Sequence, residues 1–126
     1  MELRFFGKVI NSHVFKVLFF ICLVSIEYLA TTTIQIEMVE NMWDKSNHFF
    51  AFFVLYILLS LGYLKMDMQV KIYILLTFAI QIEVVQYFIE GRYFSALDVV
   101  ADAIGIVLGI IACKILERKI PKKINI

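Results

Sequence analysis

The chain has 126 residues, of which 62% are hydrophobic and 18% are charged, and its formal net charge at pH 7 is +1. With a mean hydropathy of +0.87, it is too short and too apolar to hold a soluble domain beside membrane-spanning segments. We therefore predict one small membrane domain over residues 1–126.

Four apolar runs approach the roughly 20 residues that a helix needs to cross the hydrocarbon core of a bilayer. They predict helices at about 14–33, 46–64, 71–90 and 97–117. Because the connecting segments are brief, each helix should lie beside its sequence neighbour. The predicted fold class is all-α: a polytopic membrane protein built as an antiparallel bundle of four transmembrane helices.

The first run, 14–33, has a basic start like that of a signal peptide, but it is long and Glu27 interrupts it. Residues 30–33 also make a poor cleavage site, so we interpret the run as a retained helix. Cys22 in this run and Cys113 in the last run lie in apolar sequence. Both are expected to be small core residues and not a disulfide.

The second run opens on Asp44, Lys45 and His48, with Asp44 and His48 one helical turn apart. One interpretation is a helix N-terminus, at which Asp44 favours the positive end of the helix and Trp43 lies among lipid headgroups. The other is that these side chains begin a polar site.

In the third run Glu83, Gln86 and Glu90 share one helix face within about 60°, whereas Gln81 points the opposite way. Glu83 lies about 9 Å from the nearer end of the helix. A charge at mid-bilayer costs about 2.5–3.5 kcal/mol, so such residues normally pair, line a wet cavity or do chemistry. Arg92, just beyond the run, is either a lipid-phosphate contact or the ion-pair partner of Glu83 or of an aspartate in the next run.

In the fourth run Asp98, Asp102, Gly105 and Gly109 recur at spacings that place them on one helical stripe. A stripe of carboxylates should face protein and not lipid. The two glycines form a small-xxx-small pair, which predicts close approach of a neighbouring helix.

Lysine and arginine are concentrated before the first run, around the middle turn and in the C-terminal tail. These residues are Arg4, Lys8, Lys16, Lys65, Lys71, Lys114, Arg118, Lys119, Lys122 and Lys123. Short loops rich in Lys and Arg stay cytoplasmic, so both termini should be inside and the two acidic loops outside. The basic tail is interpreted as a topology signal that contacts anionic lipid, and no nucleic-acid partner is expected.

With that orientation, all four predicted helices bring polar residues to the outer third of the membrane. The first and third helices would end at the external face, carrying Glu27 and Glu83, and the second and fourth would begin there, carrying His48 and Asp98. The sequence therefore predicts an intramembrane polar site that opens outward.

Four fragments stand in a distinctive order and spacing. They are Asp44-Lys45-x-x-His48-Phe49-x-x-Phe52, Glu83-x-x-Gln86, Gly91-Arg92-x-Phe94-Ser95-x-x-Asp98, and the pair Gly105 and Gly109. Together they resemble the VanZ-like family of small bacterial membrane proteins over about residues 44–109. Two positions depart from the family pattern: Glu90 replaces a frequent proline, and Asp102 replaces the usual asparagine. The resemblance implies a bacterial cytoplasmic membrane location and, through the family's association with teicoplanin resistance, a role in the cell envelope.

One function compatible with such a site is binding. The site would hold the polar head of a lipid-linked cell-wall precursor or the polar edge of a lipoglycopeptide, without a cofactor. The candidate binding residues are Arg92, Lys45, Asp44, Gln86 and Asp102. Membrane lipids are the other expected partners, and a homo-oligomer is left open.

A second function is an intramembrane enzyme acting on an envelope lipid or lipid-linked sugar, with Glu83, His48 and Asp98 as candidate catalytic residues. His48 or Glu83 would be the general base, and Arg92 would hold a phosphate in its bidentate fork. Asp98 would orient His48 or Arg92. A variant adds Asp44 to these three to bind magnesium or manganese, but no spacing is diagnostic of a metal and none is predicted.

A third interpretation is purely structural, with Glu83–Arg92 and Asp98–Lys45 ion pairs joining the helices. Buried ion pairs stabilise a fold poorly compared with well-packed apolar residues, which disfavours this interpretation. The chain has no second histidine near the site, because His13 lies at the opposite end, and this disfavours enzymes that need paired histidines.

Overall fold

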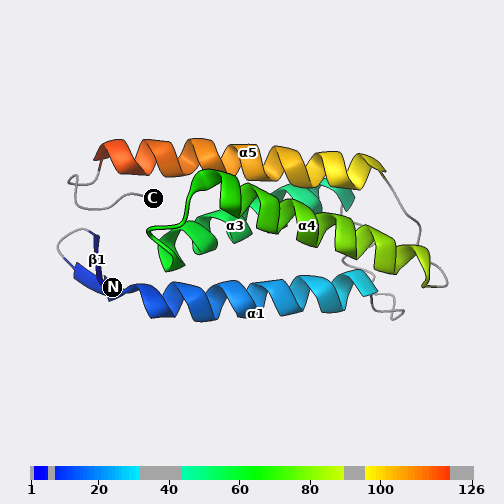
Figure 1. Cartoon of the computed structure of the whole chain (residues 1–126), viewed down its shortest axis with the longest axis horizontal. Coiled ribbons are helices and arrows are strands. Elements are labelled where there is room, and N and C mark those ends of the chain that lie inside the picture. The colour runs from blue at the N-terminus through cyan, green and yellow to red at the C-terminus, as the bar shows by residue number, and fades with distance from the viewer. Residues whose placement is uncertain (1, 6–7, 32–43, 90–95, 120–126) are drawn as a thin grey trace.

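A computed structural model describes residues 2–5, 8–31, 44–89 and 96–119 (Figure 1). These residues form four helices and a short N-terminal hairpin. The helices are α1 (Ser12–Thr31), α3 (Asp44–Gly62), α4 (Met68–Tyr87) and α5 (Ala96–Lys119), and the strands are β1 (Glu2–Phe5) and β2 (Lys8–Asn11). The four predicted helices are confirmed, and the hairpin was not predicted.

The hairpin leads directly into the first helix. Strands β1 and β2 pair antiparallel, with Glu2 opposite Asn11 and Phe5 opposite Lys8. The side chain of Asn11 then caps α1, because its Oδ1 accepts a hydrogen bond from the backbone N–H of His13 at 3.0 Å. This cap defines where α1 begins.

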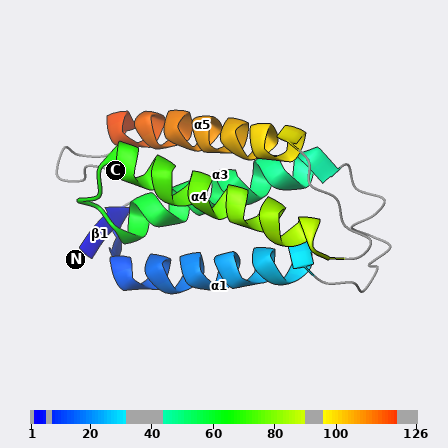
Figure 2. The same cartoon turned by 45° about the vertical axis from the view of Figure 1, so that its right-hand side comes forward.

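Helix α3 is the central element of the fold. The four helices lie side by side along the long axis of the molecule, with α1 and α4 running from left to right in Figure 1 and α3 and α5 from right to left (Figures 1 and 2). Helix α3 contacts the other three helices and packs most extensively against α5. Its buried side chains include Phe52, Leu55, Tyr56 and Leu59.

Two glycines of α5 permit this close packing against α3. A Cβ placed on Gly105 would lie 2.5 Å from the backbone oxygen of Phe49, and one on Gly109 would lie 2.8 Å from Cβ of Tyr56. Both distances are shorter than real Cβ contacts, so only glycine fits at this separation. The close approach predicted from the small-xxx-small pair is therefore confirmed, with α3 as the neighbouring helix.

Three of the four helices are long and apolar enough to cross a membrane: Ser12–Thr31, Met68–Tyr87 and Ala96–Glu117. The fourth, α3, has a shorter apolar segment, His48–Gly62, because its first turn is polar. Only Ser12 and Phe19 of α1 are buried, so most of its apolar side chains face outward. These features are those of a membrane protein.

Candidate functional site: a histidine and carboxylate cluster

His48 and Asp102 form the shortest polar contact of the site. His48 stands near the start of α3 and Asp102 on α5, and His48 Nδ1 lies 2.6 Å from Asp102 Oδ1. The Asp102 side chain is only 1% exposed, and that of His48 is 20% exposed. Because a carboxylate accepts hydrogen bonds, we assign the proton of this bond to Nδ1, which directs Nε2 to the other side of the ring.

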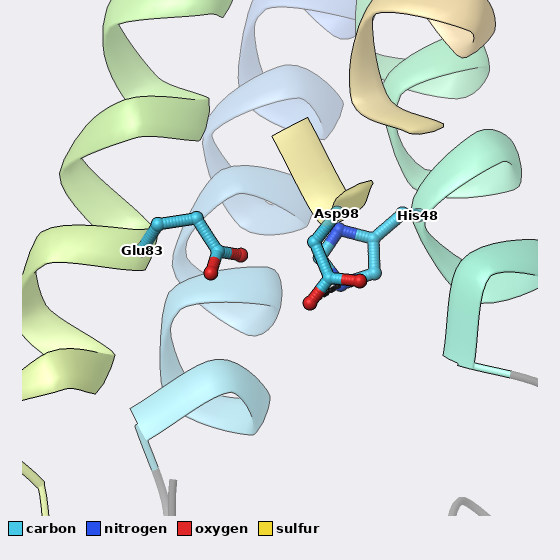
Figure 3. Close-up of side chains that lie close together, drawn as sticks. All are labelled: His48, Glu83 and Asp98. Carbon is cyan, nitrogen blue, oxygen red and sulfur yellow. Dashed lines mark ion pairs between the residues drawn. The ribbon is translucent and has the colours of Figure 1, made fainter. Parts of the chain in front are cut away.

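Asp98 lies on that other side. Asp98 Oδ2 is 3.8 Å from His48 Nε2, which is longer than a hydrogen bond. One ligand atom each from His48, Glu83 and Asp98 can be chosen so that all lie within 4.8 Å of one another. In Figure 3 the Glu83 side chain extends from α4 toward the other two. Three helices therefore contribute to one cluster, which we call the His48 cluster: His48, Glu83, Asp98 and Asp102.

Local sequence explains how the cluster forms. Asp98 and Asp102 are one helical turn apart on α5, so both face the same neighbouring helix. The next residue of that stripe is Gly105, where a Cβ would meet the backbone of α3 at Phe49. Since Phe49 directly follows His48, the glycine brings the imidazole within hydrogen-bonding distance of α5.

The cluster contains three carboxyl groups and one imidazole. Glu83 and Asp102 are fully buried, and Asp98 is partly buried. Asp102 Oδ2 is buried and has no hydrogen-bond partner among the residues that the structure describes. Within that same part of the chain, the ion pairs of the cluster are those of His48 with Asp98 and Asp102. Among the described residues, the cluster therefore sets three carboxyl groups beside one imidazole in a largely buried site.

The other predicted site residues have different positions. Asp44 and Lys45 belong to the first turn of α3, but their side chains are outside the described residues, as is all of Arg92. Gln86 is buried, and its Nε2 donates a hydrogen bond to the backbone oxygen of Ala30 on α1 at 2.9 Å. Its amide therefore joins α4 to α1.

Glu27 takes part in a second contact between α1 and α4. Gln81 Nε2 donates a hydrogen bond to Glu27 Oε1 at 2.9 Å. Gln81 lies on the face of α4 opposite to Glu83, as the helical spacing predicted. Glu27 is thus held by an amide and belongs to the α1–α4 contact.

A buried lysine, which sequence reasoning missed, lies at the other end of the bundle. The charge pattern indicated that Lys71 flanks the middle turn, but α4 begins at Met68 and Lys71 is 2% exposed. Lys71 Nζ donates a hydrogen bond to Ser60 Oγ at 3.0 Å and lies 5.1 Å from the centre of the Tyr56 ring. A cavity of about 270 Å³ is lined by Lys71 and Tyr56, together with Cys113 and Glu117.

The fold and the cluster together define a class: a small helical protein with membrane-span-like helices and a buried histidine–carboxylate site. The VanZ/LLP1 family model matches residues 1–117, so the chain belongs to that family. The match includes α1, which the sequence resemblance had left out. Comparison with curated proteins and with solved structures gives no match.

Proposed function

We propose that this protein is an integral membrane protein of the bacterial cell envelope that binds or modulates a lipid-linked envelope component. Its four helices cross the cytoplasmic membrane as an antiparallel bundle, with both termini in the cytoplasm. The His48 cluster then lies in the outer third of the membrane. The basic residues near both termini and the middle turn support this orientation.

The observation that carries the proposal is the convergence of three helices on His48, Glu83 and Asp98. Buried ionisable groups are costly in an apolar environment, and packing alone does not require them. Carboxylates and an imidazole accept hydrogen bonds from hydroxyl or amine groups, which are the polar groups of sugar- and amine-bearing headgroups. In this proposal the guanidinium group of Arg92 binds a phosphate through two parallel hydrogen bonds.

Membership of the VanZ/LLP1 family supports a proposed link to lipoglycopeptide susceptibility. The test expresses the wild-type chain, Glu83→Gln and Arg92→Lys in a Gram-positive host at matched membrane levels and measures teicoplanin susceptibility. Protection by the wild type that either variant abolishes is the expected result. No protection from any version would remove the antibiotic link. Protection that survives both variants would show that these residues do not act on the drug or its target.

The hydrogen bond between His48 and Asp102 favours a second candidate, an intramembrane enzyme acting on an envelope lipid or lipid-linked sugar. An imidazole oriented by a carboxylate is a common general base, and Glu83 would supply a further acid or base. Turnover of lipid-linked precursors by purified protein, lost in His48→Gln and Glu83→Gln, would select this candidate. Saturable binding of the same lipids without turnover would select binding.

A further inference from the structure

We propose that His48, Glu83 and Asp98 bind a divalent cation, with Asp102 as a positioning residue for the imidazole. The ligand atoms would be Nε2 of His48 and one carboxylate oxygen from each of the two acidic residues. This inference goes beyond the proposed function, because it concerns an ion and not the envelope component.

The spacing of the three side chains suits an ion. Metal–ligand bonds to nitrogen and oxygen are about 2.1 Å long, so two ligands of one ion lie at most about 4.2 Å apart. His48 Nε2 and Asp98 Oδ2 already lie 3.8 Å apart, a separation too long for a hydrogen bond. One ligand atom from each of the three residues can be chosen so that all lie within 4.8 Å of one another, and a small inward rotation of the side chains would bring them within the limit for one ion.

Asp102 provides an independent indication. Histidines that ligate metals usually donate their other ring N–H to a carboxylate or carbonyl oxygen, which orients the ring and makes it a better ligand. The 2.6 Å contact between His48 Nδ1 and Asp102 Oδ1 has this arrangement. Asp102 Oδ2 is also buried without a hydrogen-bond partner among the described residues, so the imidazole and a bound cation would be what offsets the charge of this carboxylate.

Charge and ligand type favour a small divalent ion. Three carboxyl groups surround one imidazole in a largely buried site, and two positive charges would offset their repulsion. Two oxygen ligands and one nitrogen suit Mn²⁺ or Mg²⁺, which keep further positions for water or phosphate oxygen. A bound cation would therefore let this acidic site also accept a phosphate-bearing headgroup.

The test uses Mn²⁺ alone as the probe and the full chain purified in detergent after treatment with a chelator. Titration calorimetry measures affinity and stoichiometry, and electron paramagnetic resonance detects a nitrogen ligand through its hyperfine coupling. The variants are His48→Gln, Glu83→Gln and Asp98→Asn. Glu117→Gln is the matched control, because it makes the same chemical change at the opposite end of the molecule.

We expect one Mn²⁺ per chain with nitrogen coupling in the wild type and in Glu117→Gln. Loss of a residue that only orients a metal ligand weakens metal binding about 10–100-fold. Loss of a ligand itself should therefore weaken Mn²⁺ binding by at least that factor. His48→Gln should also lose the nitrogen coupling. Lack of saturable binding by the folded wild type, or equal affinity in all variants, would overturn the inference. Envelope-lipid binding that persists after chelation would support the proposed function even without a bound cation. Failure of the cation inference can therefore be distinguished from failure of the proposed function.

Discussion

His48 Nδ1 lies 2.6 Å from Asp102 Oδ1, and this single contact leaves Nε2 of the imidazole to face Asp98. The bond joins α3 to α5 at the point where Gly105 lets the two backbones approach. Packing and site chemistry are therefore coupled: a change that separates α3 from α5 should also disturb the imidazole.

Replacement of Asp102 tests its positioning role. Asp102→Ala removes the acceptor of the Nδ1–H bond, so Mn²⁺ affinity should fall about 10–100-fold. Asp102→Asn should cost less, because its amide oxygen still accepts that hydrogen bond. Calorimetric titration measures both, and circular dichroism checks that each variant keeps its helices. Wild-type affinity in Asp102→Ala would contradict the role.

Gly105→Ala tests the coupling between packing and site. The added methyl group would meet the backbone oxygen of Phe49 at 2.5 Å, which cannot move without shifting α3. We expect a loss of about 1–3 kcal/mol in the free energy of unfolding, as for other overpacked cores, together with weaker Mn²⁺ binding. The exposed neighbour Val107 supplies the control, since Val107→Ala should change neither quantity appreciably. Equal thermal stability of the two variants in detergent would argue against close packing at Gly105.

The contact between Ser60 and Lys71 predicts non-additive stability changes. Ser60→Ala leaves the buried ammonium of Lys71 without its hydroxyl acceptor, which should destabilise the protein by about 1–3 kcal/mol. Once Lys71→Met is present, adding Ser60→Ala should have little further effect. Ser25→Ala is the control, because that exposed hydroxyl bonds only its own helix at Ile21. Thermal unfolding followed by circular dichroism measures all four variants, and simple additivity would show that the two residues are not coupled.

Much of the site could be predicted from the sequence, because helical spacing shows which residues share a face. The stripe of Asp98, Asp102 and Gly105 was correct in this sense, as was the convergence of His48, Glu83 and Asp98 at one end of the helices. Periodicity does not show which side chains will pair across helices. The choice of Asp102 as the hydrogen-bond partner of His48 therefore appeared only in the structure.

Other features were beyond sequence reasoning for physical reasons. Lys71 was counted as a loop charge, because a count of charges does not reveal that Ser60 and Tyr56 provide a buried environment for an ammonium group. Gln86 shares a helix face with Glu83, yet its amide reaches the carbonyl of Ala30, where α1 nears its end. Neither contact has a signal in local sequence, since both join segments far apart in the chain.

The proposed orientation predicts where fused reporters will be active. Alkaline phosphatase folds only outside the cytoplasm, so a fusion after Ile126 should be inactive and one inserted in residues 34–43 should be active. The physical reason is the retention of Lys- and Arg-rich segments in the cytoplasm. If the fusion after Ile126 were active and the one in residues 34–43 inactive, at equal expression, the orientation would be the opposite one. The His48 cluster would then lie at the cytoplasmic face.

The lipids that copurify with the protein would show whether the His48 cluster binds an envelope lipid. Wild-type chain, Glu83→Gln and the control Glu117→Gln would be isolated from the same host at equal yield and analysed by mass spectrometry. If the His48 cluster binds a lipid headgroup, a lipid-linked envelope component should be enriched with the wild type and the control and depleted in Glu83→Gln. Identical lipid profiles in all three preparations would contradict a binding role for the His48 cluster.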